Sequence, residues 1–375
     1  MFTWSRFAAI MVKEFVQVRR DRLTFAMMIG VPVMQLVLFG YAINMDPKGL
    51  PMAIVAAESS PFSRSLVRSL EASGYFRVVA QPATEAAAEA LIAEGDVQFV
   101  LHLPADFARK LVRGERPVVL VEADASDPAA TGNALAALQS LNQSALDRDL
   151  SGPLSRLRTE QPAFELRVHR RYNPEGITAY NIVPGLMGVV LTMTMVMMTS
   201  LAMTRERERG TMENLLATPV RPFEVMAGKI VPYILIGYVQ VAVILGAAKL
   251  LFQVPMVGSL ALLSAILVLF IAANLAVGFT FSTLARNQMQ AMQMTFFFFL
   301  PSMLLSGFMF PFRGMPGWAQ TIGEVLPLTH FLRIVRGILL KGNQWNDIVL
   351  EVAALAAFLV ASGGIAMARY RETLD

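Results

Sequence analysis

The chain has 375 residues, of which 55% are hydrophobic and only 16% are charged. A soluble domain carries about 25% charged residues, so this composition, with its long uncharged runs, excludes an ordinary soluble protein and indicates an integral membrane protein. The absence of cysteine excludes disulfides, thiol catalysis and cysteine-based zinc sites.

The net charge of +4 is divided unevenly along the chain. Residues 46–175 hold 14 Lys and Arg against 17 Asp and Glu, a net charge of −3, and the remaining residues hold 18 against 11, a net charge of +7. A basic excess around apolar runs is typical of membrane anchoring, whereas nucleic-acid binding needs a basic stripe on one folded face. We therefore expect no nucleic-acid partner.

Residues 1–22 are predicted to form a cytoplasmic interfacial helix. Trp4, Phe7, Met11 and Phe15 recur at helical spacing, and most basic residues lie elsewhere around the helix. Such a helix lies in the membrane surface with its apolar face in lipid, and packing against the rest of the protein is the alternative. Its charges are too mixed for a signal peptide, so the next apolar run should remain as an anchor.

Six apolar runs reach the roughly 20 residues that a membrane-spanning helix needs. They predict a polytopic α-helical membrane protein with six transmembrane helices, at residues 23–45, 177–203, 230–248, 260–284, 289–310 and 348–368. With the N-terminus inside, the cytoplasmic segments hold 13 basic residues and the short outer loops hold five: Lys249, Arg313, Arg333, Arg336 and Lys341. The positive-inside rule then places both termini, including the tail 369–375, in the cytoplasm.

Residues 46–176, between the first two spans, are predicted to form an inserted extracytoplasmic α/β domain. Expected strands at 52–58, 76–81, 97–104, 117–124 and 164–172 alternate with expected helices at 63–73, 84–93, 105–113 and 129–150. This alternation favours a partly parallel sheet. A block of about 130 residues is large enough for one core.

Residues 311–342, between the fifth and sixth spans, are too polar to span the membrane and too apolar for a free loop. We expect short helices that dip into the outer leaflet as a re-entrant segment. Irregular backbone at that depth survives only when it is buried in protein or faces water. The segment is therefore a candidate lid over a pathway.

No catalytic or metal site is predicted. The only Gly-Lys pair, Gly228 and Lys229, lacks the rest of a phosphate-binding loop, so the chain is not expected to hydrolyse ATP alone. His102, His169 and His330 are far apart in sequence and are interpreted as structural or surface residues. The middles of the spans carry no ionisable residue, since Glu351 lies near an end, and this disfavours an ion-coupled carrier.

The main functional signal is a cytoplasmic loop at residues 204–228, after the second span. Thr211 can cap a new helix, Met212, Leu215 and Leu216 form one apolar stripe, and Pro219 ends the helix. A two-turn helix is unstable alone, so its stripe docks either on another chain, as a transmission element, or on the protein's own membrane face. Spacing alone leaves these two alternatives equal.

Residues 183–240 resemble the core of type-2 ABC exporter permeases, where a span precedes E-x-E-x-G-T-x-E-x-L-x-x-T-P, G-K and another span. The matching positions are Glu206, Glu208, Gly210, Thr211, Glu213, Leu215, Thr218, Pro219, Gly228 and Lys229. Residues 11–25 and 327–342 are similar to the family's N-terminal helix and late outer segment. The domain between the first two spans resembles that of the drug-exporter branch.

The resemblance implies that residues 210–218 form a coupling helix in a groove of a separate ABC ATP-binding subunit. ATP and Mg²⁺ would bind there, which leaves no cofactor in this chain. The expected coupling residues are Glu206, Glu208, Arg209, Gly210, Thr211, Met212, Glu213, Leu215, Leu216, Thr218 and Pro219. The resemblance also implies a bacterial inner membrane with its lipid, a second copy or sister permease, and a periplasmic adaptor protein.

The expected function is that of a permease subunit exporting an apolar or amphipathic compound, drug-like or lipid-like, from the cytoplasm or inner leaflet. Met193, Met197, Phe296 and Phe297 are candidate pathway residues, because thioethers and aromatic rings suit varied apolar ligands. Lipid-facing or core packing of these residues is the alternative. A second hypothesis is a membrane-anchored interaction or assembly protein whose outer α/β domain is the working part.

Overall fold

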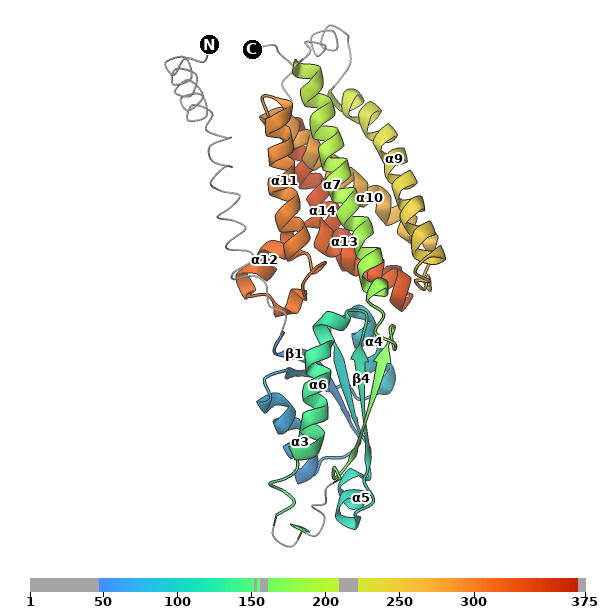
Figure 1. Ribbon diagram of the computed structural model, residues 1–375, viewed down its shortest axis with the longest axis vertical. Helices are drawn as coiled ribbons and strands as arrows, with labels where there is room; N and C mark the ends of the chain where they lie inside the picture. Colours follow the sequence, from blue (N-terminus) through green and yellow to red (C-terminus); the bar gives the residue numbers. More distant parts are fainter. Residues whose placement is uncertain (1–46, 152–153, 156–160, 209–221, 370–375) are drawn as a thin grey trace, which may run out of the picture.

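The computed structural model describes residues 47–151, 154–155, 161–208 and 222–369, which form an α/β domain and a helical bundle stacked along one long axis (Figure 1). The predicted interfacial helix 1–22, the first span 23–45, most of the loop 204–228 and nearly all of the tail lie outside the described residues.

The α/β domain is built on a sheet of five strands, at the five places where the sequence predicts them. The strands are β1 Leu50–Ala56, β2 Phe76–Ala80, β3 Phe99–Leu103, β4 Val118–Asp124 and β5 Glu165–Arg171. Their order in space is β2-β1-β3-β4-β5. Only β3 and β4 pair antiparallel, and every other neighbouring pair is parallel, which confirms the partly parallel sheet.

Helices cover both faces of this sheet. They are α3 Pro61–Ala72, α4 Glu85–Glu94, α5 Phe107–Arg113 and α6 Pro128–Ser144. Helices α3, α5 and α6 enclose the larger core, while α4 packs alone on the opposite face, against residues such as Ala53 and Val100. The predicted fourth helix is shorter than expected, because α6 ends at Ser144 and irregular turns follow to Leu150.

Local signals fix the start and end of α4, the helix nearest the bundle (Figure 1). The Thr84 hydroxyl accepts a hydrogen bond from the Ala87 N–H, which caps the first turn. Gly95 ends the helix in the left-handed region, with a φ of 86°, a conformation that glycine adopts without steric cost. The last turn of α4 is thereby presented toward the membrane part of the protein.

In the part of the chain that the structure describes, the bundle contains five long helices. They are α7 Thr178–Glu208, α9 Pro222–Leu250, α10 Leu260–Leu284, α11 Gln288–Leu305 and α14 Trp345–Arg369. Among the described residues, four segments are long and apolar enough to cross a membrane, within α7, α9, α10 and α14. Helix α11 occupies the predicted fifth span, but three glutamines in its first two turns reduce its apolar character and it ends at Leu305 rather than 310. The six-span count remains a prediction.

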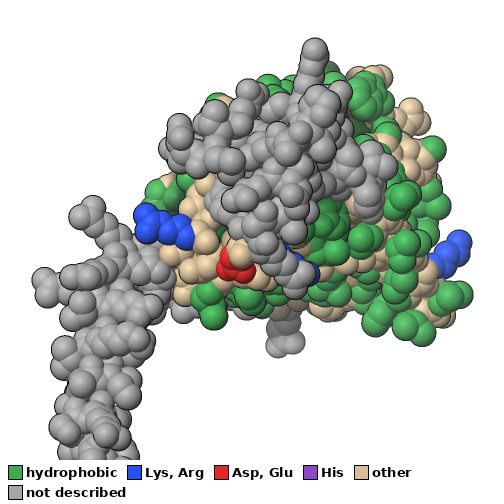
Figure 2. All heavy atoms as spheres, turned by 90° about the horizontal axis from the view of Figure 1, so that it is seen from above, with side chains coloured by type: hydrophobic (Ala, Val, Ile, Leu, Met, Phe, Trp, Pro, Cys, Tyr) green, Lys and Arg blue, Asp and Glu red, His purple; other side chains and the backbone are tan. Residues whose placement is uncertain are grey.

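Close packing in the bundle depends on small residues. A Cβ on Gly278 of α10 would lie 2.5 Å from the Val196 carbonyl oxygen of α7, so only glycine lets these backbones approach so closely. The Phe270 and Phe331 rings stack at a centroid distance of 4.0 Å, and this contact joins α10 to the segment 311–342, called the outer segment below. Viewed from the end opposite the domain, the described side chains around the bundle are mostly hydrophobic (Figure 2).

The outer segment folds as short helices at the end of the bundle that faces the α/β domain (Figure 1). It contains the 3₁₀ turn η3 Phe312–Gly314, α12 Gly317–Val325, α13 Pro327–Arg336 and the π-helical turn η4 Gly337–Lys341. The expectation of short helices between 311 and 342 is confirmed. Their depth in a membrane remains a prediction.

Candidate functional site

The outer segment (residues 311–342) and the adjoining Asn343 donate side-chain hydrogen bonds to main-chain oxygens at the end of α4. Three contacts make this attachment: Lys341 Nζ to Ile92 O (3.1 Å), Asn343 Nδ2 to Ala93 O (3.2 Å) and Arg313 Nη2 to Gly95 O (2.7 Å). The final carbonyls of a helix lack intrahelical partners and form the negative end of its dipole. Cationic donors therefore suit this position, and they fasten the domain to the bundle.

A buried ion pair reinforces the attachment. Lys341 Nζ lies 2.7 Å from Asp124 Oδ2 at the end of β4, and both side chains are only 9% exposed. The same ammonium lies 5.3 Å from the centre of the Tyr172 ring. Removing one partner of such a pair would leave an uncompensated buried charge, which costs several kcal/mol.

A polar network holds α12, α13 and α14 together beside this attachment. His330 Nδ1 contacts the Glu351 carboxylate, and His330 Nε2 lies 2.8 Å from the Glu324 carbonyl oxygen. Both ring nitrogens of His330 therefore have an oxygen partner. Arg333 donates to the carboxylates of Glu324 (3.0 Å) and Glu351 (3.1 Å). His330 thus belongs to a charged network rather than to an isolated surface position.

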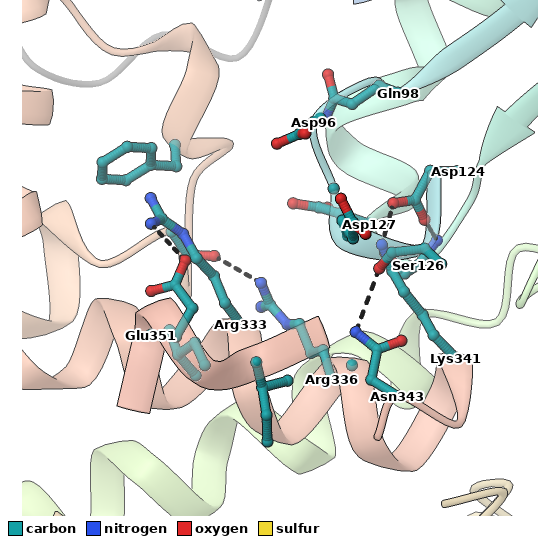
Figure 3. A pocket seen from close by; sticks show the side chains of 18 of the residues that line it. Asp96, Gln98, Asp124, Ser126, Asp127, Arg333, Arg336, Lys341, Asn343 and Glu351 are labelled. Carbon is teal, nitrogen blue, oxygen red and sulfur yellow. Dashed lines mark hydrogen bonds and ion pairs between the residues drawn. The ribbon is translucent and has the colours of Figure 1, made fainter. Parts of the chain in front are cut away.

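A cavity of about 410 Å³ lies between the domain and the bundle, next to these contacts. We call it the junction cavity (Figure 3). Its charged residues on the domain side are all acidic: Glu94, Asp96, Asp124 and Asp127. Its basic residues all belong to the outer segment: Arg313, Arg333, Arg336 and Lys341. The bundle side also carries the acidic residues Glu324, Asp347 and Glu351, of which Glu324 and Glu351 pair with Arg333, so the domain wall is acidic and the bundle wall is of mixed charge.

Two buried groups in the cavity wall lack hydrogen-bond partners among the described residues. Arg336 uses Nη1 to donate to the Gly307 carbonyl oxygen at 3.1 Å, but its Nε and Nη2 atoms are buried and unpaired. On the domain side, Gln98 Oε1 is buried and unpaired as well. An unsatisfied buried polar group is costly, so these two side chains contribute less to stability than fully paired groups would.

A second charged cluster lies on the same face of the sheet as α4, where Arg171 also bonds to Glu89 of α4. Glu122 on β4 accepts from Arg171 at 3.1 Å and lies 3.5 Å from His102 and 3.6 Å from His169. Burial alone would raise the Glu122 pKa, but the hydrogen bond and charge of Arg171 outweigh it, and the pKa lies below its ordinary value. Two histidines far apart in sequence thus meet at one carboxylate. No metal-binding group of three such residues occurs in the part of the chain that the structure describes.

At the other end of the bundle, Glu208 connects α7 to the start of α11. Its carboxylate accepts from the Gln288 backbone N–H at 2.8 Å and from the Gln288 side-chain amide. These hydrogen bonds are the main reason that the pKa of Glu208 is lowered. Glu206 also lies in α7. The other predicted coupling residues, from Arg209 to Pro219, lie outside the described residues.

The candidate pathway residues lie on two helices, α7 and α11. Met193 and Met197 are half-buried on α7, whereas Phe296 and Phe297 on α11 are 41% and 44% exposed. The two helices meet through other residues, including Ser200 and Thr295, whose hydroxyls lie 3.2 Å apart. None of the four pathway candidates lines the junction cavity, and their role in a pathway remains a prediction.

The junction cavity is the structural feature that sequence reasoning missed. Two of its signals are visible in the sequence: the net negative charge of residues 46–175 and the basic residues of the segment 311–342. Their opposite signs would have suggested that these two regions dock on each other. Nothing in the sequence indicated which carbonyl oxygens the basic residues bind.

Comparison with known proteins places this architecture in a family. The model of the ABC-2 family transporter protein matches residues 22–368. The chain is 28% identical over 378 residues to "Probable multidrug ABC transporter permease YbhS" of Escherichia coli strain K12, covering 100% of this chain and 99% of that protein. It is 29% identical over 337 residues to "Inner membrane transport permease YhhJ" of the same organism, covering 86% of each.

A more distant relative extends the comparison beyond bacteria. "ABC transporter G family member 20" of Dictyostelium discoideum is 24% identical over 336 residues, which cover 89% of this chain and 46% of that protein. Together with the apolar helices of α7, α9, α10 and α14, the family match over almost the whole sequence decides the assignment. The chain belongs to the ABC-2 family of transporter proteins and is a membrane permease of the ABC-2 type.

Proposed function

We propose that this chain is the membrane-spanning permease subunit of an ATP-driven exporter, with ATP and Mg²⁺ bound and hydrolysed on a separate ABC ATP-binding subunit. The observation that carries the proposal is the family match over residues 22–368, which includes the loop 204–228. The lack of a phosphate-binding loop in the sequence agrees with a motor on another polypeptide.

In this proposal, the coupling helix at residues 210–218 docks in a groove of the ATP-binding subunit. Closure of two such subunits on ATP displaces the coupling helix, and the displacement enters the bundle through α7. Glu208, at the end of α7, is bonded to the start of α11, so movement of one helix end is carried directly to the other. This contact supports a path for force from the loop into two helices.

The proposed cargo is an apolar or amphipathic compound, drug-like or lipid-like, moved out of the cytoplasm or inner leaflet. Two relatives are named as a multidrug permease and an inner-membrane permease, and both names support the same class and a bacterial inner membrane for this chain. We further propose a dimer with an identical or sister permease, and a periplasmic adaptor as an outer partner.

ATPase stimulation tests the coupling step. The permease is reconstituted with its ATP-binding subunit, and the wild type is compared with the double variant Glu213→Ala, Leu215→Ala. We expect stimulation to fall about tenfold, because truncating a hot-spot residue of an interface costs about 2 kcal/mol or more. A double variant in the α/β domain, Val112→Ala with Glu115→Ala, is the matched control, since both side chains are exposed. Unchanged coupling in the loop variant would argue strongly against the assigned helix.

Topology is tested separately by thiol labelling, since the chain has no native cysteine to interfere. An Ala86→Cys variant, at an exposed position of α4, is expected to react in intact cells with a thiol reagent that does not cross the inner membrane. A Glu213→Cys variant is expected to react only after lysis. The opposite pattern would reverse the proposed orientation of both termini and of the α/β domain.

A further inference from the structure

We propose that α12 presents an apolar stripe to the lipids of the outer leaflet, at the layer where acyl chains meet headgroups, and that the same layer surrounds the whole outer end of the bundle. The stripe consists of Trp318, Ile322 and Val325, which are 42%, 45% and 65% exposed. The inference rests on the proposed function for the membrane and its orientation. It adds the helix and the side chains that meet the leaflet.

The stripe occupies one face of α12, and the opposite face is fixed to the bundle. The three apolar residues stand at positions i, i+4 and i+7, which lie on one side of a helix. On the other side Gly323 is buried, and a Cβ there would lie 2.6 Å from the Leu305 carbonyl oxygen of α11. Rotating α12 to bury the stripe would break this close approach, so in the part of the chain that the structure describes the stripe stays on the surface.

A second group of exposed apolar side chains lies at the same end of the bundle, where α9 is joined to α10. It consists of Leu250, Leu251, Phe252 and Val257, which are between 46% and 81% exposed. The backbone N–H of Val257 donates to the Leu339 carbonyl oxygen of η4 at 3.1 Å. This hydrogen bond places the connection between α9 and α10 at the level of the outer segment, to which η4 and α12 both belong.

The two apolar groups lie on different sides of the bundle, and this favours lipid over a docked protein. Figure 1 shows α12 beside the end of α11, with the outer end of α9 on the opposite side. One protein partner would cover one side only, whereas a leaflet covers both. Trp345, at the start of α14, is also exposed at this end, and tryptophan is enriched where membrane and water meet. Exposed Lys249 can extend its ammonium from there to the headgroups.

The length of α10 gives the depth of this level. The helix has 25 residues, from Leu260 to Leu284, and the exposed Arg286 follows its inner end. A hydrocarbon core of about 30 Å corresponds to roughly 20 helical residues. Counted from Leu284, the core therefore ends roughly one turn inside the outer end of α10. The connection before α10, and α12 at the same level, then lie in the layer between the acyl chains and water.

The lipid-facing helix is bonded directly to the helix that holds the α/β domain. Glu324, next to Val325 on α12, accepts from Arg333 of α13 at 3.0 Å, and its carbonyl oxygen lies 2.8 Å from His330 Nε2. Helix α13 continues into η4, which carries Lys341. The outer leaflet therefore supports the same elements that fasten the domain to the bundle.

Tryptophan quenching by lipid tests the proposal, because the chain has only three tryptophans, Trp4, Trp318 and Trp345. Trp4→Phe with Trp345→Phe leaves Trp318 alone, and Trp4→Phe with Trp318→Phe leaves Trp345 alone. Each full-length variant is reconstituted in phosphatidylcholine vesicles, with and without lipids brominated near the top of their acyl chains. We expect these bromines to reduce the emission of either tryptophan about twofold, since both rings lie at the interface.

The matched control carries Val112→Trp in a chain whose three native tryptophans are replaced by phenylalanine. Val112 is 42% exposed on α5, in the α/β domain, and its tryptophan should not be quenched. Unquenched Trp318 would overturn the proposal. So would quenching of Trp318 only by bromines near the ends of the acyl chains, since α12 would then lie at the middle of the membrane.

A spin label distinguishes lipid from a protein that covers the stripe. Ile322→Cys and the control Val112→Cys are made in the native chain, which has no other cysteine, and each is labelled with a nitroxide. We expect the label at Ile322 to collide mainly with oxygen, which concentrates in lipid, and the label at Val112 mainly with a water-soluble nickel complex. A label at Ile322 shielded from both would show that protein covers the stripe, and the proposal would be wrong.

Both measurements are independent of the proposed transport activity. They use the permease without its ATP-binding subunit, and brominated lipid is present in both leaflets, so the result does not depend on which side of the protein faces out. A failed coupling or topology experiment therefore leaves the lipid contact of α12 intact. Thermal unfolding of each variant at the wild-type temperature shows that its fold is kept.

Discussion

The α/β domain buries nearly all of its large apolar side chains, whereas the helical bundle of the same chain exposes many of them. Among the described residues of the domain, the exposed large hydrophobic side chains are Val79 and Val112. On α9 alone, Leu235, Val239 and Val243 are each more than 60% exposed. The domain is built to be surrounded by water, and the outer faces of the bundle are built to be surrounded by lipid or another membrane subunit.

This difference determines what holds each part together. In water, burying apolar surface stabilises the domain directly. In lipid, an apolar helix face gains little by leaving its solvent, so close packing and polar contacts between helices matter more. The bundle has such contacts: Thr194 Oγ1 to Gln240 at 2.9 Å, Tyr238 OH to the Ser264 carbonyl at 2.7 Å, and Ser200 with Thr295. The α/β domain is held to the bundle in a third way, by buried charged side chains such as Lys341 and Asp124.

The largest loss of stability is expected from breaking the contact between the α/β domain and the bundle. Lys341→Met removes one partner of the buried pair with Asp124, and we expect the free energy of unfolding to fall by about 3–5 kcal/mol. The measurement is denaturant unfolding in detergent, followed by tryptophan fluorescence. The control is Lys110→Met, which breaks a pair of similar length, 2.8 Å, at a side chain that is 40% exposed, and should cost far less, because exposed ion pairs contribute little to stability. Equal losses in the two variants would contradict the role given to the junction.

The next largest loss of stability is expected from overpacking the contact between α7 and α10. Gly278→Ala forces a methyl group against the Val196 carbonyl oxygen, and overpacking of this kind costs about 1–3 kcal/mol. The unfolding temperature in detergent should fall accordingly. Gly246→Ala on α9 is a matched control, since a Cβ there meets no atom within 4 Å. If both alanine variants unfold at the same temperature, α7 and α10 do not depend on this close approach.

A smaller, pH-dependent effect is expected in the domain. The lowered pKa of Glu122 means that its ionised form is favoured by folding. The resulting stability is present above the ordinary glutamate pKa of 4.5 and is lost as the pH falls through the lower folded value. The unfolding temperature of the wild type minus that of Glu122→Gln should therefore shrink between about pH 5 and pH 3. A difference that grows on acidification would show that Arg171 does not stabilise the carboxylate.

The smallest effect is expected at the exposed end of α7. Glu208→Ala removes the two hydrogen bonds to Gln288, and because the site is exposed, ATPase stimulation by the permease should fall by less than about fivefold. Stimulation is measured in reconstituted vesicles together with thermal unfolding. Unfolding at the wild-type temperature is expected, and a large loss of stability would mean that Glu208 supports the bundle rather than its coupling.

The sequence predicted the helices and strands far better than it predicted the contacts between the α/β domain and the bundle. Alternating strands and helices located β1 to β5, and apolar runs located α7, α9, α10 and α14, because these signals are local. The end of α11 was misplaced, since residues 306–310 are as apolar as the helix before them. Lys341 and Asp124 are separated by 217 positions, and no local pattern specifies a contact of that kind. The charges were visible in the sequence, but their pairing depended on the fold.

The attachment of α4 by its main-chain oxygens has a consequence for protein engineering. Lys341, Asn343 and Arg313 recognise the place where a helix stops, and they are indifferent to the side chains that the helix carries. Chimeras that transplant a foreign outer module onto this bundle are therefore expected to stay tethered, provided that the graft ends a helix at the same spot and supplies a carboxylate for Lys341.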